Sequence, residues 1–283
     1  MERARIHPWQ GSLHHEDFLI ECQGINDIEQ RSILKNIERY GICQIRLQNQ
    51  PPEDYVVESL YKLMGQPANR QNDFEGIIKD LLPTPGIEAN TGSSAGDLGF
   101  HVDGTQADLQ PALLIFQYVA TATLGGNSRF ADTAKVLLDI EPEQREQLLI
   151  NLARKDAAAF SKKGMDHVGP VFSFPDGYSL ACRVRYDSVL TINPDCESNF
   201  QLLKSRFDDP KYQTLFKPRP GDVIVFDNWR IMHARDEIYS QVQRHHRRVW
   251  LNFLRQELQS RYFLGIRPIS DGVKAKIKEA NGL

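Results

Sequence analysis

The stretch Phe100-His101-Val102-Asp103 predicts a β-strand that carries two metal ligands. Side chains two positions apart on an extended strand point to the same face, so His101 and Asp103 can bind one ion. His233 offers a third ligand from far along the chain. A sheet-rich fold brings distant strands side by side, so these residues predict one metal centre built from two strands.

Two histidines and one carboxylate bind one face of an octahedral metal and leave the opposite face open. This ligand set and open face favour Fe(II), as in non-haem oxygenases, although zinc also binds such ligands. One alternative is therefore a zinc hydrolase, in which the metal lowers the pKa of bound water. Another is a non-enzymatic jelly-roll binding module that retains the three residues without using them.

An arginine after the third ligand favours the oxygenase, because its fork can hold the carboxylate of a co-substrate with two parallel hydrogen bonds. Strand alternation places Arg248 on the same face as Trp250 and Asn252. Arg247 is the alternative if the register differs by one residue. The basic residues 244–246 are expected to form a solvated turn before the strand.

Hydrophobic periodicity predicts a mainly β fold with flanking helices, organised as one domain over residues 1–283. The expected helices cover residues 26–40, a segment that starts after Pro51-Pro52 and runs to Met64, residues 133–153 with an interruption near Pro142, and residues 196–216. The expected strands cover residues 42–47, 111–118, 128–131, 223–226 and 249–254, with a hairpin over 171–192. Residues 65–99 have no packing periodicity and are interpreted as a lid or substrate loop.

The composition indicates an ordinary globular protein, with 41% hydrophobic residues and a net charge of −3. This charge gives no reason to expect nucleic acid or an anionic membrane as a partner. No apolar run has membrane-spanning length and the N-terminus has no apolar leader, so a cytoplasmic location is expected. The four scattered cysteines are expected to be reduced and buried. The sequence leaves open whether the protein forms a homo-oligomer.

Four segments together resemble the taurine dioxygenase family of Fe(II)/2-oxoglutarate-dependent oxygenases, whose relatives include gamma-butyrobetaine hydroxylase and clavaminate synthase. They match that family in order and spacing over about residues 90–256. The segments are Phe100-His101-Val102-Asp103, Gly125-Gly126-Asn127-Ser128-Arg129-Phe130-Ala131-Asp132, Pro220-Gly221-Asp222 and Asp227-Asn228-Trp229-Arg230-Ile231-Met232-His233-Ala234-Arg235.

The resemblance implies a distorted double-stranded β-helix, the jelly roll of cupin-like proteins, with helices packed outside. It implies that iron is held by three residues, His101, Asp103 and His233. The family's arginine for 2-oxoglutarate falls on Arg248, and its hydroxyl residue falls on Ser128. The family's second arginine, which binds an anionic substrate group, falls on Asn252, which argues against a sulfonate held in the same way.

The reaction implied by the resemblance consumes O2 and 2-oxoglutarate, releases succinate and CO2, and oxidises an unactivated C–H bond. Hydroxylation of a small molecule such as an amino acid or another carboxylate metabolite is expected. Asp103 disfavours halogenation, because halogenating relatives lack the carboxylate ligand. Arg183 and Arg185 share a strand face and are candidate substrate contacts together with Asn252, although an ion pair with a nearby acidic residue would also explain the two arginines.

Overall fold

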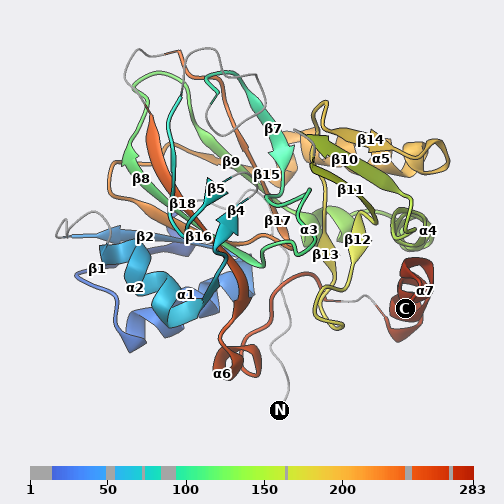
Figure 1. The fold of residues 1–283 in the computed structure, drawn as a ribbon, viewed down its shortest axis with the longest axis horizontal. Helices are drawn as coiled ribbons and strands as arrows, with labels where there is room; N and C mark the ends of the chain where they lie inside the picture. Colours follow the sequence, from blue (N-terminus) through green and yellow to red (C-terminus); the bar gives the residue numbers. More distant parts are fainter. Residues whose placement is uncertain are drawn as a thin grey trace.

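The computed structural model describes residues 15–48, 55–71, 74–83, 94–162, 165–239, 244–267 and 270–283. Two β-sheets dominate this part of the chain (Figure 1). The larger sheet consists, in spatial order, of β1 (Leu19–Cys22), β2 (Ile42–Leu47), β16 (Val223–Asp227), β8 (Leu113–Ala120), β18 (His245–Leu254) and β3 (Gly65–Pro67), with β6 (Lys79–Leu81) also paired to β18. The smaller sheet consists of β15 (Gln213–Phe216), β9 (Ser128–Asp132), β17 (Ile231–Arg235) and β7 (Leu98–His101).

Strand β8 lies in the middle of the larger sheet. This central position explains why the sequence of β8 is a continuous apolar run. It pairs antiparallel with β16 on one side and with β18 on the other. Its first six residues are buried, because both faces of the sheet are covered. Between the two sheets lies a core rich in aromatic rings, whose members are Phe18, Ile42, Ala68, Leu114, Phe116, Tyr118, Phe130, Phe216, Ile224, Phe226, Ile231 and Trp250. This arrangement confirms the predicted jelly roll with flanking helices.

Helices α1 (Asp27–Tyr40) and α2 (Tyr55–Met64) pack against the outer face of the larger sheet (Figure 1). Helix α1 begins at Asn26, whose side chain accepts hydrogen bonds from two backbone N–H groups in a capping box with Glu29. It ends at Gly41, which adopts the left-handed conformation with φ 75°. Both helices were predicted from the apolar periodicity of their sequences.

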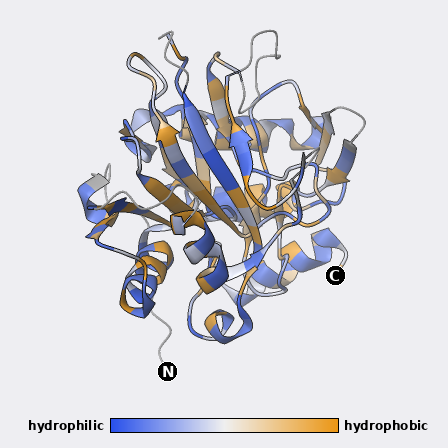
Figure 2. Cartoon of the chain, turned by 60° about the vertical axis from the view of Figure 1, so that its left-hand side comes forward, coloured by the Kyte–Doolittle hydropathy of each residue, from blue (hydrophilic) through white to orange (hydrophobic). Residues whose placement is uncertain are grey.

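Further helices and a small sheet cover the smaller sheet from its other side (Figure 1). The helices are α3 (Thr133–Leu138), α4 (Pro142–Leu152), α5 (Glu197–Asp208) and α7 (Asp271–Asn281), and α6 (Gln256–Gln259) follows β18. The small sheet consists of β11 (Met165–Gly169), β10 (Ala158–Lys162) and β14 (Leu190–Ile192), and β12 (Phe172–Ser173) pairs with β13 (Ala181–Cys182). Hydrophilic and hydrophobic residues follow one another along the strands of the two sheets (Figure 2). This pattern is expected for strands in which one face is more polar than the other.

The structure corrects two boundaries predicted from the sequence and adds a sheet that was not predicted. The predicted helix over 196–216 ends at Asp208, because Pro210 follows, and residues 213–216 form β15 at the sheet edge. The last strand begins at His245 rather than at Val249. The small sheet over 158–169 was not predicted.

Several of the described residues in the predicted lid over residues 65–99 form short strands. Strands β3 and β6 extend the larger sheet beside β18, while β4 (Arg70–Gln71) and β5 (Phe74–Glu75) form a separate pair. Residues 72–73 and 84–93 lie outside the described residues, so the remainder of that prediction is untested.

Candidate active site

His101 and His233 are brought together by the pairing of strands β7 and β17. The two residues are direct partners in the antiparallel register, and their ring centroids lie 4.1 Å apart. Asp103 follows the end of β7, and its Oδ1 lies 3.7 Å from Nε2 of His101 and 3.9 Å from Nε2 of His233. The structure therefore gathers all three predicted ligands at one buried point.

A hydrogen bond to the backbone determines which ring nitrogen of His101 is free to bind a metal. Its Nδ1 donates a hydrogen bond to the carbonyl of Gly99 at 2.9 Å, which leaves Nε2 unprotonated toward Asp103. The chain then turns sharply after Asp103 at Gly104, which has φ 74°. A Cβ at this glycine would lie 2.4 Å from Cδ of Pro111, so the turn requires glycine.

The two oxygens of Asp103 have different surroundings. Oδ1 faces the two imidazoles, whereas Oδ2 accepts hydrogen bonds from Arg248 Nη1 at 2.9 Å and from Trp250 Nε1 at 3.0 Å. The Asp103 backbone is fixed as well, because Asn228 accepts from its N–H at 2.9 Å and donates to its carbonyl at 3.0 Å. The side chain of Asn228 thus fixes the backbone of a proposed ligand residue.

His233 is held by aromatic packing. Its ring lies 5.0 Å from that of Phe226 and 5.5 Å from that of Phe116, centroid to centroid. Its Nδ1 is buried and has no hydrogen-bond partner among the described residues.

The protonation states of the three groups suit metal binding. Burial lowers the pKa of His101, and burial together with the neighbouring His101 lowers the pKa of His233 well below its ordinary value. Burial alone would raise the pKa of Asp103, but Arg248 and the two imidazoles outweigh it and lower that pKa. Two neutral imidazoles and one carboxylate are therefore available without removing a proton.

These three residues fit a divalent metal ion. The ligand atoms of His101, Asp103 and His233 all lie within 4.8 Å of one another. Metal bonds to nitrogen and oxygen are about 2.0–2.2 Å long, so ligand atoms on one ion are separated by at most about 4.4 Å. The two distances from Asp103 Oδ1 to the imidazole nitrogens, 3.7 and 3.9 Å, satisfy this limit, and the bound of 4.8 Å on the whole set lies about 0.4 Å above it.

A second cluster, near the opposite end of the inward face of β18, corrects the expectation that residues 244–246 form a solvated turn. Arg244 and His246 are 5% and 3% exposed, and Arg244 Nη1 lies 2.9 Å from His246 Nδ1. Tyr118 shares a hydrogen bond of 2.9 Å with Ser128, and its hydroxyl is also a partner of Arg244. Among the described residues no carboxylate pairs with Arg244, and its Nε is buried without a partner.

The alternation predicted for β18 places Arg248 toward the interior with Trp250. Arg247 turns to the other face, where its Nε donates to Asp80 at 3.2 Å. Asp80 also lies 2.6 Å from His245 Nε2. Arg247, the alternative co-substrate residue, is therefore directed away from the three metal-ligand candidates.

The three predicted substrate contacts have different environments. Arg185 is buried and forms an ion pair with Asp187, with Nε 2.7 Å from Oδ1, and its charge lowers the pKa of His101 and of His233. Arg183 donates to the carbonyls of Thr105 and Ala107, in the turn that follows Asp103. Asn252 is half-buried on β18.

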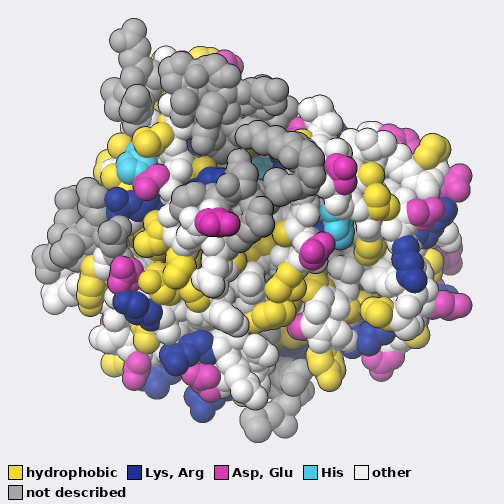
Figure 3. All heavy atoms as spheres, in the orientation of Figure 1, with side chains coloured by type: hydrophobic (Ala, Val, Ile, Leu, Met, Phe, Trp, Pro, Cys, Tyr) yellow, Lys and Arg dark blue, Asp and Glu magenta, His cyan; other side chains and the backbone are white. Residues whose placement is uncertain are grey.

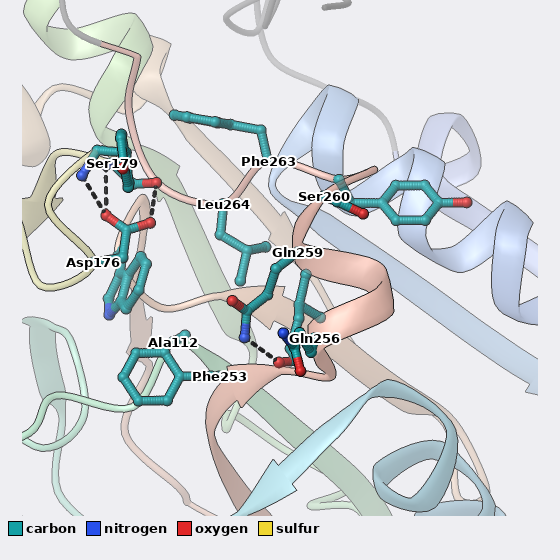
Figure 4. A pocket seen from close by; sticks show the side chains of 13 residues that line it. Ala112, Asp176, Ser179, Phe253, Gln256, Gln259, Ser260, Phe263 and Leu264 are labelled. Carbon is teal, nitrogen blue, oxygen red and sulfur yellow. Dashed lines mark hydrogen bonds between the residues drawn. The ribbon is translucent and has the colours of Figure 1, made fainter.

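A separate cavity of about 490 Å³ lies where Trp229, α6 and the turn after β12 meet (Figure 4). Its wall includes Trp229, Phe253, Leu264 and Asp176, and none of the three metal-ligand candidates lines it. Asp176 accepts hydrogen bonds from the N–H and hydroxyl of Ser179, so its carboxylate is already satisfied.

On the face shown in Figure 3, acidic and basic side chains are interspersed, and neither sign of charge forms a separate patch.

A family comparison decides the class of this protein. The family model described as Taurine catabolism dioxygenase TauD, TfdA family matches residues 20–250. The chain belongs to this family. It is an Fe(II)- and 2-oxoglutarate-dependent non-haem iron oxygenase, as the resemblance implied.

Individual relatives of this TauD/TfdA-family oxygenase are distant. The chain is 23% identical to the uridine-5'-phosphate dioxygenase of Amycolatopsis sp over 224 residues, which cover 72% of this chain and 81% of the relative. It is 27% identical to the 3-((Z)-2-isocyanoethenyl)-1H-indole synthase of Fischerella ambigua over 196 residues, which cover 62% of this chain and 70% of the relative. A solved asparagine oxygenase, in complex with Fe(II), 2S,3S-3-hydroxyasparagine and succinate, has the same fold with a TM-score of 0.65, 16% identity and 85% of each chain covered.

The described helices of this TauD/TfdA-family oxygenase include none with the length and apolar character needed to span a bilayer. All four cysteines are free and buried, as predicted.

Proposed function

We propose that this oxygenase hydroxylates an unactivated C–H bond of a small molecule, such as an amino acid or another carboxylate metabolite, with iron held by His101, Asp103 and His233. The observation that carries the proposal is the buried set of three ligand atoms within 4.8 Å of one another. Bound Fe(II) would supply the O2 and redox chemistry that couples loss of CO2 from 2-oxoglutarate to oxidation of the substrate. Family membership leaves no support for the zinc hydrolase or the non-enzymatic module.

We further propose that Arg244, with Ser128 and Tyr118, holds the distal carboxylate of 2-oxoglutarate. Support comes from the burial of Arg244 without an acidic partner among the described residues, beside two hydroxyl groups. An arginine that lacks its anion in a buried site is suited to receive one from a ligand. Ser128 keeps the role proposed from the sequence.

Arg248 has a different role from Arg244 in this proposal. Its Nη1 already donates to Asp103 Oδ2 at 2.9 Å, so it lies beside the metal position. Arg248 is therefore proposed to orient Asp103 and the metal-bound end of the co-substrate, while Arg244 holds the far end. Arg244 directly precedes β18 and Arg248 lies on its inward face, so this strand and the residue before it are proposed to position the co-substrate along its length.

The remaining residues exclude water and orient the reacting groups. Phe116 and Phe226 cover one side of His233, and Asn228 fixes the backbone of Asp103. Arg185 lies close enough to lower the pKa of both imidazoles, so it is retained as a candidate substrate contact together with Arg183 and Asn252.

Succinate release, measured with Fe(II), 2-oxoglutarate and a panel of candidate substrates, tests the proposal. The panel contains amino acids including asparagine, small carboxylates and a nucleoside monophosphate. The expected result is O2-dependent succinate release that one class stimulates, with a product heavier by one oxygen atom. Stimulation by a compound that gains no oxygen would contradict hydroxylation.

A further inference from the structure

Trp250 makes an unusual contact for a residue in the aromatic core: its indole N–H is bonded to a proposed metal ligand. The ring is 2% exposed and belongs to the cluster between the two sheets. Its Nε1 donates to Asp103 Oδ2 at 3.0 Å, although Trp250 and Asp103 lie far apart in the sequence.

The same oxygen of Asp103 accepts from Arg248 at 2.9 Å, so Oδ2 has two donors on the protein side. Oδ1 has neither donor and faces the imidazoles at 3.7 and 3.9 Å. With Oδ2 occupied in this way, one oxygen remains for a metal. A carboxylate that uses one oxygen occupies a single coordination position, whereas a bidentate carboxylate occupies two.

Packing fixes the direction of the indole. The guanidinium carbon of Arg248 lies 4.8 Å from the centroid of the Trp250 ring. The Trp250 backbone is held on both sides, by pairing with Leu114 of β8 and by a hydrogen bond of 2.8 Å from the N–H of Ala68 to its carbonyl. A neutral donor held this firmly orients the carboxylate without adding a second positive charge beside it.

We propose that Trp250 is a positioning residue, which holds Asp103 so that only Oδ1 binds the metal and a coordination position stays open for co-substrate or O2. This inference rests on the proposed function, because it requires a metal at His101, Asp103 and His233. Residues that orient a metal ligand typically change metal affinity by 10- to 100-fold when they are replaced.

Trp229 provides a matched control. It is also 2% exposed, and its Nε1 donates one hydrogen bond, to the carbonyl of Gln110 at 3.3 Å, but it contacts no proposed ligand side chain. Trp250→Phe and Trp229→Phe therefore remove the same atoms from equally buried sites. Both variants are expected to lower the melting temperature through lost packing, and only Trp250→Phe is expected to weaken metal binding.

The experiment titrates metal-free wild type and both variants with Co(II), by calorimetry and by visible absorption, after circular dichroism confirms folding. We expect Trp250→Phe to raise the Co(II) dissociation constant about tenfold and to change the Co(II) spectrum, and Trp229→Phe to change the constant less than about twofold. If Trp250→Phe does not fold, a benzothienylalanine at position 250, which keeps the ring shape and lacks the N–H, takes its place.

Two results would overturn the inference in distinguishable ways. If wild type binds one Co(II) and the two variants bind it equally well, Trp250 is a packing residue only and the proposed metal site survives. If wild type binds no Co(II), the metal site fails and the role of Trp250 fails with it.

Discussion

His101 and His233 lie directly opposite each other on the antiparallel strands β7 and β17, with ring centroids 4.1 Å apart. Cross-strand partners are among the closest side-chain neighbours that a sheet provides. The smaller sheet therefore sets the separation of the two imidazoles, while the larger sheet supplies Arg248 and Trp250 to orient the carboxylate. The proposed metal site joins the two sheets of the jelly roll.

Replacing His233 with alanine should abolish metal-dependent turnover. Only His101 and Asp103 would remain as ligands, and the variant should bind Fe(II) more than about 100-fold more weakly, which is the upper end of the effect of residues that only orient ligands. Metal content after gel filtration and succinate release are the measurements. Wild-type turnover in this variant would show that His233 is not a ligand.

Replacing Arg244 with lysine should raise the KM for 2-oxoglutarate by about 10- to 100-fold. The lysine keeps the charge but loses the fork, and hydrogen bonds to charged groups contribute about 1.5–3 kcal/mol. Arg247→Lys is the control, because Arg247 faces Asp80 on the other side of the strand. Equal KM values for the two variants would remove Arg244 from the co-substrate site.

Asp227 should make the stability of the protein depend on pH. Burial raises its pKa to about 7 from an ordinary value of 3.8, against the lowering effect of the N–H groups of Gly265 and Trp229 and of Arg230. The folded protein then holds a proton that the unfolded chain releases, so stability is lost as the pH rises from about 4 to 7.

Asp227→Asn tests this dependence, because asparagine does not ionise. At 1.36 kcal/mol per pKa unit, wild type should lose about 2–3 kcal/mol more unfolding free energy than the variant between pH 5 and pH 8. Urea denaturation at both pH values measures the difference. Parallel losses in the two proteins would mean that Asp227 is ionised throughout.

The ion pair between Arg230 and Asp132 should be much more important for stability than an exposed pair of the same length. In each of the pairs Arg230–Asp132 and Lys204–Asp208, the nitrogen lies 2.7 Å from the carboxylate oxygen. The side chains of Arg230 and Asp132 are 1% and 0% exposed, whereas those of Lys204 and Asp208 are 37% and 54% exposed. Asp132→Ala should cost about 3–5 kcal/mol by leaving a buried guanidinium without its carboxylate. Asp208→Ala should cost no more than about 1 kcal/mol, and chemical denaturation would compare them. Similar costs would contradict the importance assigned to burial.

Much of the site could be predicted because its residues follow simple geometric rules. The motif His101-Val102-Asp103 identified two of the ligands, although β7 ends at His101 and Asp103 lies in the turn that follows. The helices over residues 27–40 and 55–64 likewise follow from apolar periodicity and capping residues.

The position of Arg244 could not be predicted in the same way, because buried charged residues are exceptions to the usual surface preference of arginine. A run of basic residues at 244–248 indicates a solvated turn unless the strand is known to begin at His245. Alternation extended backward from Trp250 through Arg248 and His246 was the available signal. The short strands over residues 65–81 are formed by pairing with β18, so local sequence does not specify them.

Visible absorption of the metal-free protein under anaerobic conditions, after addition of Fe(II) and then 2-oxoglutarate, tests the central claim most directly. A co-substrate bound to iron at His101, Asp103 and His233 should produce a weak charge-transfer band that the His233→Ala variant lacks. Absence of the band in folded, iron-loaded wild type, or an equal band in the variant, would contradict the proposed site.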